Sequence, residues 1–403
     1  AATMFRNGSP ELPAVVDPQL VDLFAGPGGL DVAAHWLGRP SVGIEFDESA
    51  VKTREAAGLV SIHADVREWR SSDFGASVNV LAGGPPCQTY TVAGKGHGRR
   101  ALTQVIDLVE RLGAGHGDEV DAELASHCDP RTGLVLRPLM WALEALEGGS
   151  PFEAIMLEQV PAVERVWRAM AEVLESHGYG TDVAVLRTEE YGVPQTRRRA
   201  ILIARLGVPT EEVWLPAPTH QKYTGSSAGP DPSSELPRWV SMADALGTTA
   251  PFTVISNYSL GGDITKRCQR RHDRPAFTVT GKASRNRFKF DAGHEERLSM
   301  QDAGRLQTFP ADYPWRGRDI SQQIGNAIPP RLGAHILAHL LGLDVDLSEE
   351  FFARRMSTWS RPSEATASLV RGAIVHEVNA RSATTIVGPP HRDDAHVEEA
   401  VAV

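Results

Sequence analysis

The chain has 403 residues, a length that favours two or three domains and a core large enough to need no disulfide bonds. Hydrophobic residues make up 41% and charged residues 23%, a composition that excludes an intrinsically disordered protein. The three cysteines, Cys87, Cys128 and Cys268, are too far apart for a C-x-x-C zinc or redox site, and their low, odd number favours a reducing compartment. No apolar run approaches the roughly 20 residues of a membrane span. We expect a cytosolic globular protein.

The charge is unevenly distributed along the chain. The 41 basic and 51 acidic side chains give a net charge of −10, which by itself argues against a nucleic-acid-binding protein. Residues 257–290, however, hold nine basic side chains against two acidic ones, so this stretch carries +7 and the remainder −17. One basic face on an acidic body suits a polyanionic partner, whereas a basic loop in solvent needs none. Charge alone does not decide between the two.

Short apolar segments alternate with amphipathic helical segments through the first half of the chain. Repeated alternation of strand and helix predicts a doubly wound, mostly parallel α/β sheet. We expect strands at 20–24, 41–44, 60–63, 78–82, 154–157, 183–186 and 199–206, and helices at 30–37, 134–146 and 163–176.

The sequence changes character after residue 206. Residues 207–250 are rich in proline, serine and glycine, and helical patterns return only at 299–306 and 330–341. We therefore predict three parts: a first domain at 14–206 that is completed by 320–345, a smaller irregular domain at 207–319, and a partly disordered extension at 346–403.

A glycine-rich turn follows the first predicted strand and opens a helix. Glycines let the backbone approach a ligand closely, and a helix N-terminus offers unpaired N–H groups to an anionic part of that ligand. Glu45 follows Gly26 by 19 residues, at the end of the second strand, where a carboxylate can accept hydrogen bonds from ribose hydroxyls. The turn lacks the G-x-G-x-x-G spacing of a dinucleotide site. We predict a nucleoside-containing cofactor; the alternative is a tight turn beside an unrelated surface carboxylate.

Cys87 follows the fourth predicted strand in the segment Gly83-Gly84-Pro85-Pro86-Cys87-Gln88. Its place at the carboxyl end of a parallel strand is where open α/β folds bind their ligands. A lone cysteine is more often a small buried apolar residue than a reactive one. Here two prolines stiffen the loop and a glycine-rich run follows at 94–98, an arrangement typical of a fixed nucleophile beside a mobile lid.

These residues carry a resemblance to the bacterial type of cytosine-C5 DNA methyltransferase. Six segments occur in that family's order, between residue 20 and about residue 343, so the resemblance covers most of the chain and is very specific. They are Asp22-Leu23-Phe24-Ala25-Gly26-Pro27-Gly28-Gly29, Pro86-Cys87-Gln88, Glu158-Gln159-Val160, Gln195-Thr196-Arg197-Arg198-Arg199, Arg305-Leu306-Gln307-Thr308-Phe309-Pro310 and Gln323-Ile324-Gly325-Asn326-Ala327-Ile328-Pro329-Pro330. The chain departs from the family pattern at Gln159, where asparagine is usual, and at Tyr90 and Thr91. In the family that amide helps position the cysteine loop, so the extra methylene of Gln159 bears on where the loop lies.

The resemblance implies an S-adenosylmethionine-dependent (Rossmann-like) methyltransferase fold in which Cys87 is the nucleophile. A thiolate added at C6 of cytosine makes C5 nucleophilic enough to accept a methyl group. Glu158 and Arg199 would relieve the charge that develops at N3 and O2. Alternation along a strand places Arg197 on the same face as Arg199 and Arg198 on the other, so Arg197 is included among the catalytic residues. We find no convincing metal-ligand cluster and expect no metal.

The resemblance also implies a cofactor site and a DNA-binding face. The cofactor is S-adenosylmethionine and the product S-adenosylhomocysteine; the family pattern places Phe24 near the adenine, Glu45 on the ribose, and Asp65 with Val66 at the adenine edge. The expected cofactor-binding residues are Phe24, Ala25, Gly26, Gly28, Gly29, Leu30, Glu45, Phe46, Asp65, Val66, Pro85, Asn326 and Ala327. The expected DNA-binding residues are Gln88, Thr91, Gly94, Lys95, Gln195, Lys266, Arg267, Arg270 and Arg271.

By this resemblance the domain at 207–319 recognises the target, and the partner is double-stranded DNA from which a cytosine is flipped out. We expect a monomer without membrane contact, alone or alongside a restriction endonuclease that acts on the same site. Two alternatives stay open: a transfer-RNA cytosine-C5 methyltransferase, whose own signature we do not find, and a DNA-binding regulator that has lost turnover. A nicotinamide-dependent oxidoreductase explains the first glycine turn and none of the later segments.

Overall fold

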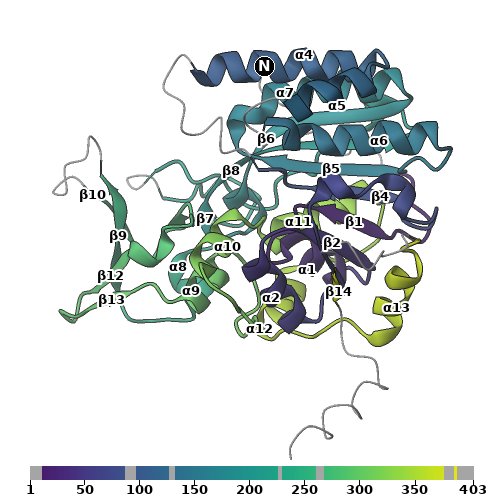
Figure 1. The fold of residues 1–403 in the computed structure, drawn as a ribbon. Coiled ribbons are helices and arrows are strands. Elements are labelled where there is room, and N and C mark those ends of the chain that lie inside the picture. Colours follow the sequence, from purple (N-terminus) through teal and green to yellow (C-terminus); the bar gives the residue numbers. More distant parts are fainter. Residues whose placement is uncertain are drawn as a thin grey trace, which may run out of the picture.

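The computed structural model describes residues 11–86, 97–126, 132–225, 229–259, 267–375 and 385–387. Its centre is an eight-stranded sheet with the order β14-β3-β2-β1-β4-β5-β8-β6 (Figure 1). The five strands from β3 to β5 are parallel, β8 runs antiparallel to both of its neighbours, and β14 is antiparallel to β3. The strands are β1 (Leu20–Leu23), β2 (Ser41–Glu45), β3 (Ser61–His63), β4 (Val80–Gly83), β5 (Ala154–Gln159), β6 (Tyr179–Arg187), β8 (Arg198–Leu206) and β14 (Thr385–Val387). The predicted mostly parallel α/β sheet is confirmed.

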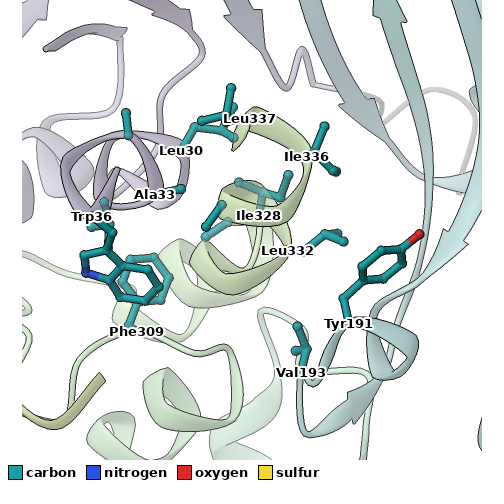
Figure 2. Packing of buried hydrophobic residues seen from close by; sticks show 14 of the residues in the cluster. Leu30, Ala33, Trp36, Tyr191, Val193, Phe309, Ile328, Leu332, Ile336 and Leu337 are labelled. Atoms are coloured by element: carbon teal, nitrogen blue, oxygen red, sulfur yellow. The ribbon is translucent and has the colours of Figure 1, made fainter. Parts of the chain in front are cut away.

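Buried residues of these strands alternate between two hydrophobic clusters, as expected for a sheet covered on both faces. In β1, Leu20 belongs to one cluster and Val21 to the other, and in β4 Val80 and Leu81 divide in the same way. The first cluster includes residues of α1 (Gly29–Trp36) and α11 (Pro330–Leu340), whose packing is shown in Figure 2. The second includes residues of α4 (His97–Gly113), α6 (Arg137–Glu147), α7 (Glu164–Ser176) and α13 (Glu364–Gly372).

A second sheet projects to one side of the central sheet (Figure 1). It is antiparallel with the order β10-β9-β12-β13, and its strands hold part of the basic stretch of the sequence. Its strands are β9 (Phe252–Ser259), β10 (Arg267–Arg271), β12 (Arg287–Phe290) and β13 (Glu295–Arg297). The strands β7 (Gln195–Thr196) and β11 (Ala276–Phe277) pair in parallel and form a separate two-stranded sheet. The predicted smaller domain therefore contains a four-stranded sheet.

The remaining helices are short or lie outside the two sheets. They are α2 (Glu48–Ala57), α5 (Gly117–Ser126), α8 (Met242–Leu246), α9 (Met300–Leu306), α10 (Ile320–Asn326) and α12 (Glu349–Ser357), with short 3-10 turns between them. Phe309, Tyr313 and Trp315 follow α9 and are buried in the same cluster as α1 and α11.

The described part of the C-terminal extension packs on the first domain. Phe352 of α12 is fully buried against His335 and Trp36, and Glu349 forms an ion pair with buried Arg331 of α11. β14 then adds a strand to the edge of the sheet at β3. Within the described residues, no helix combines the length and the apolar character needed to cross a membrane.

Candidate active site

The turn after β1 has the shape that its glycines predict. Gly26 and Gly28 have φ values of 55° and 101°, in the left-handed region that glycine adopts without strain. A Cβ atom on Gly29 would lie 2.3 Å from the carbonyl oxygen of Ile328. The turn is therefore packed directly against the segment that leads into α11. This close approach brings the predicted cofactor residues Asn326 and Ala327 to the same end of the sheet.

A buried ion pair fixes the helix that follows this turn. The sequence analysis did not predict this pair. The Arg54 guanidinium of α2 donates to the Asp31 carboxylate of α1 at 2.6 Å and to the Ser61 hydroxyl of β3 at 2.7 Å. Both charged side chains are fully buried. Beside them, burial and then the negative charge of Asp31 raise the pKa of Asp22 well above its usual range. The first turn of α1 is thus tied to two neighbouring elements.

Glu45 lies where the second strand ends and faces the glycine turn. Its carboxylate accepts hydrogen bonds from the backbone amides of Gly26 and Asp47, both at 2.7 Å. Burial raises the pKa of Glu45, and these two amide hydrogen bonds oppose that rise. Phe46, the next residue, is 71% exposed and free to cover a flat ligand. The glycine turn and this carboxylate together fit a nucleoside cofactor such as S-adenosylmethionine.

The residues after β3 place a second acid near the same end of the sheet. Asp65 accepts three side-chain hydrogen bonds from the Arg67 guanidinium and one from the Arg67 backbone amide, while Val66 is buried. Burial alone would raise the pKa of Asp65, but the hydrogen bonds from Arg67 hold it below its usual range. An adenine amino group at this edge would have to share the carboxylate with Arg67.

Replacing Glu45 with alanine is expected to weaken S-adenosylmethionine binding roughly 10- to 100-fold, the effect of losing hydrogen bonds to a charged group. The variant removes both a ribose acceptor and the bond that holds Gly26. Isothermal titration calorimetry measures the change, and Glu45→Gln is the matched control because it keeps the shape and one acceptor oxygen. The DNA target sequence should not change. Unaltered affinity in Glu45→Ala would remove Glu45 from the cofactor site.

Glu158 and Arg199 form an ion pair at the carboxyl end of β5. The Arg199 Nε and Glu158 Oε1 atoms are 2.6 Å apart, and both side chains are largely buried, at 13% and 7% exposure. Burial lowers the pKa of Arg199, and the carboxylate opposes this change. A Cβ atom on Gly84 would lie 3.6 Å from Glu158 Oε2, so the loop that follows β4 passes beside the pair. A buried carboxylate and a guanidinium thus meet beside the loop that leads to Cys87.

Cys87 itself lies outside the described residues, as do Gln88, Thr91, Gly94 and Lys95. The base of their loop is described. The Gln159 side-chain amide donates to the carbonyl oxygen of Pro85 at 2.7 Å, and its own oxygen accepts from the Val160 amide at 2.5 Å. The longer Gln159 side chain therefore still reaches Pro85, two residues before Cys87 in the sequence.

Arg197 has a different environment from Arg199. Its side chain is 1% exposed, and its guanidinium donates to the carbonyl oxygens of Val279, Gly325 and Ala327 at 2.9–3.2 Å. Burial, and then the charge of Arg199, lower its pKa well below the usual value. The geometry assigns Arg197 to holding the segment around α10, since its donors point at backbone carbonyls.

Gln195 has a similar internal role. Its side-chain amide donates to the Leu306 carbonyl at 2.8 Å and contacts Gln307, while its oxygen accepts from the Val279 amide. Gln195 is fully buried, and no DNA base can reach it in this conformation. Asn326 by contrast is exposed at the end of α10 and is paired with Gln322.

Of the predicted basic DNA-binding residues, Arg271 is exposed and Arg270 is half-buried. Lys266 lies outside the described residues, and Arg267 begins β10. Arg271 is exposed at the end of β10, with a surface ion pair to Asp291 at 3.5 Å. The Arg270 guanidinium is turned inward and donates to Thr196, Pro275 and Ala276. Arg271 is the better placed of the two for a phosphate.

Glu189 is a buried acid that the sequence analysis did not single out. It precedes the Gln195–Arg199 segment, is 0% exposed, and its oxygens have no hydrogen-bond partner among the described residues other than its own backbone amide. Arg187 lies 3.8 Å away. Burial raises the pKa of Glu189 to about 7, with Arg187 and Arg270 opposing the rise. Two consecutive glutamates, Glu189 and Glu190, are typical of an exposed charged surface. No local sequence pattern indicates that Glu189 is buried.

The raised pKa of Glu189 makes a testable contribution to stability. The folded state binds this proton between pH 4.5 and about 7 while the unfolded state releases it, so the contribution falls as the pH rises through that window. Relative to Glu189→Gln, the protein is expected to lose about 2 kcal/mol of unfolding free energy between pH 5 and pH 8. Urea unfolding at both pH values measures this difference. Parallel pH dependences in the two proteins would contradict it.

A mostly parallel sheet with a glycine turn after its first strand and a carboxylate at the end of its second is consistent with a Rossmann-like, S-adenosylmethionine-dependent methyltransferase. The profile of the C-5 cytosine-specific DNA methylase family matches residues 19–110 and 153–228. The chain belongs to this cytosine-C5 methyltransferase family.

Several characterised relatives are similar over most of their length. The Type II methyltransferase M.AplI of Arthrospira platensis is 28% identical over 347 residues, which cover 81% of this chain and 87% of that protein. The Type II methyltransferase M1.HphI of Haemophilus parahaemolyticus is 25% identical, with 81% and 87% covered. M.FnuDI of Fusobacterium nucleatum is also 25% identical, with 79% and 93% covered.

Solved structures share the fold. The crystal structure of the S. pombe Dnmt2 methyltransferase aligns with a TM-score of 0.53 at 15% identity and covers 80% of this chain and 98% of that one. A putative DNA modification methyltransferase encoded within an E. coli prophage aligns with a TM-score of 0.51 at 15% identity and covers 81% and 99%. At these identities the likeness concerns the fold alone.

Proposed function

We propose that the protein is a DNA (cytosine-5-)-methyltransferase that modifies cytosine within a short recognition sequence, in a restriction–modification or an orphan methylation system. The observation that carries the proposal is the buried Glu158–Arg199 ion pair beside the loop that leads to Cys87. Membership of the cytosine-C5 family and the Type II methyltransferase names of its relatives support it.

In this mechanism the Cys87 thiolate adds to C6 of the flipped cytosine, forming a carbon–sulfur bond. Glu158 supplies or shares a proton at N3, so the ring becomes a neutral enamine, and Arg199 stabilises charge at O2. S-adenosylmethionine, when bound, supplies an electrophilic sulfonium methyl group, and its bond to that methyl breaks as C5 takes it. Water or hydroxide then removes the C5 proton, the C6–sulfur bond breaks to release the Cys87 thiolate, and the N3 proton returns to Glu158.

The chain's own residues organise this reaction around three anchors. Gln159 holds the base of the cysteine loop through Pro85, Glu45 holds the glycine turn, and Arg197 holds the segment that packs against that turn. Each of these bonds joins elements far apart in the sequence. The reacting groups are thereby oriented without a metal ion in any of these steps.

Double-stranded DNA would lie between the carboxyl end of the central sheet and the basic second sheet. Arg271 and its exposed basic neighbours would contact phosphates, whereas flipping brings the cytosine to Glu158 and Arg199. Binding should therefore weaken steeply with salt.

The test of this function uses methyl-labelled S-adenosylmethionine with duplex DNA or with bulk transfer RNA. Label in DNA, recovered as 5-methylcytosine after hydrolysis, is the expected result. Label in transfer RNA alone would favour the transfer-RNA methyltransferase. DNA binding without transfer to either nucleic acid would favour the inactive regulator, although the intact Gln159–Pro85 bond gives no structural reason for lost turnover.

A further inference from the structure

We propose that Arg270 is a positioning residue that couples the DNA-recognition sheet to the catalytic Arg199. This inference rests on the proposed methyltransferase function and assigns Arg270 a role other than phosphate binding. The role follows from where the guanidinium points, what surrounds it and which chain segment it holds.

The Arg270 side chain leaves β10 toward the central sheet. Its Nη1 atom donates to the Thr196 hydroxyl at 2.9 Å and to the carbonyl oxygens of Pro275 and Ala276 at 3.0 and 2.9 Å. Such charge-assisted hydrogen bonds are stronger than neutral ones. Thr196 and Ala276 belong to the two strands of the β7–β11 ladder, so the Arg270 guanidinium joins β10 to both of them.

Two aromatic rings confine the same guanidinium. Its central carbon lies 4.1 Å from the centre of the Phe277 ring and 5.0 Å from that of the buried Tyr223 ring. A planar guanidinium can stack on rings and donate hydrogen bonds in its own plane, which a lysine ammonium cannot do. Glu189 contributes a favourable negative charge nearby. The site is specific for arginine.

The segment that Arg270 holds is the one that leads to the catalytic Arg199. Thr196 precedes Arg197, which ties down the loop around Gly325 and Ala327. Arg199 follows two residues later and pairs with Glu158. The Thr278 hydroxyl adds a second bond from the recognition side to the Thr196 carbonyl at 2.8 Å. A shift of β10 on DNA binding would therefore reach Arg199 through three residues of chain.

Arg271 provides a matched comparison in the same strand. Adjacent residues of a strand point to opposite faces, and its side chain is 55% exposed. A phosphate-binding role for β10 predicts that removing Arg271 lowers DNA affinity and reduces the slope of log affinity against log salt by about one. Arg270 should leave that slope unchanged and instead affect the rate of methyl transfer.

The experiment compares Arg270→Ala, Thr196→Val and Arg271→Ala with the wild-type protein. Single-turnover methyl transfer at saturating DNA and S-adenosylmethionine is expected to slow about 10-fold or more in Arg270→Ala, with an unchanged salt slope. Thr196→Val, which keeps the shape of Thr196, should slow the same step, and its effect should be smaller in the Arg270→Ala background. Ethylguanidinium should restore part of the rate in Arg270→Ala, beyond a sodium chloride control of equal ionic strength, and not in Arg271→Ala.

A second measurement does not require turnover. Hydrogen exchange of the free protein is expected to show faster exchange at 195–199 and 276–279 in Arg270→Ala than in Arg271→Ala. Equal protection in the two variants would overturn the proposal, as would an Arg270→Ala protein with a normal transfer rate and a reduced salt slope. A wild-type protein that methylates no DNA would instead refute the proposed function, and the exchange result would still decide whether Arg270 couples the two sheets.

Discussion

Replacing Cys87 with alanine is expected to abolish methyl transfer to DNA while the protein still binds S-adenosylmethionine. Without a thiolate at C6, the C5 atom of cytosine is too weak a nucleophile, and loss of a covalent nucleophile costs on the order of 10⁵-fold in rate. The cofactor contacts predicted for the glycine turn and Glu45 do not involve this residue. Labelled methyl transfer and cofactor calorimetry on one preparation separate the two effects.

Cys87→Ser is the matched variant, since it keeps the size of the side chain and replaces sulfur with a far less acidic hydroxyl. It should be as inactive as Cys87→Ala at neutral pH. Turnover near the wild-type rate in either protein would refute Cys87 as the nucleophile and would direct attention to another group beside Glu158.

Glu158→Gln is expected to lower the rate of methyl transfer on the order of 10²- to 10⁴-fold, the range for losing a general acid or base. Glutamine keeps the shape of the side chain but cannot carry the transferable proton. It also leaves the buried Arg199 guanidinium without its negative partner, 2.6 Å away. The affinity for S-adenosylmethionine should change little. The cofactor is expected at the glycine turn and Glu45, whereas the ion pair lies beside Gly84 in the loop that follows β4.

A control for this variant is Glu164→Gln on α7. Glu164 pairs with Arg168 on the protein surface, where such a pair contributes little to stability. Single-turnover rates of the two variants on the same duplex make the comparison. A Glu158→Gln rate within about three-fold of the Glu164→Gln rate would remove Glu158 from the chemistry.

Most of the central sheet could be predicted from the sequence because its strands are continuously buried. Apolar runs with polar ends mark β1, β2 and β4 clearly, and each begins or ends within two residues of the expected position. The helices between β4 and β5 were harder to predict from the sequence. Only one helix was expected there, but α4 and α5 precede it. The single buried side chain of α5 is Val120, and ion pairs such as Arg111–Glu123 and Arg137–Asp121 hold this helix, so it has almost no apolar pattern to detect.

The site shows where strand periodicity stops being informative. Alternation from 195 to 199 predicted that Arg197 and Arg199 act together. In the structure β7 ends at Thr196 and β8 begins at Arg198, so Arg197 lies at a break between two strands and turns to backbone carbonyls. A run of three arginines gives no indication that one of them is fully buried. The same limit applies to Arg270, whose acceptors lie in segments distant from it in the sequence or across a turn.

Gln159 stands where the family pattern has asparagine, and the structure shows what the longer side chain contacts. Its extra methylene was a reason to question the position of the cysteine loop. The side chain instead reaches Pro85 while its own oxygen turns back to the Val160 amide, so the bond to the loop is present. The residue type differs from the family pattern, but the side chain still forms a hydrogen bond to the described segment that leads to Cys87.

Bisulfite sequencing of plasmid DNA tests the central claim most directly. The plasmid would come from a host without cytosine methylation that expresses either the wild-type chain or Cys87→Ala. We predict that cytosines within one short motif are protected from conversion by the wild-type protein and converted in the variant. Complete conversion in both, with both proteins folded and expressed, would contradict DNA cytosine-C5 methylation.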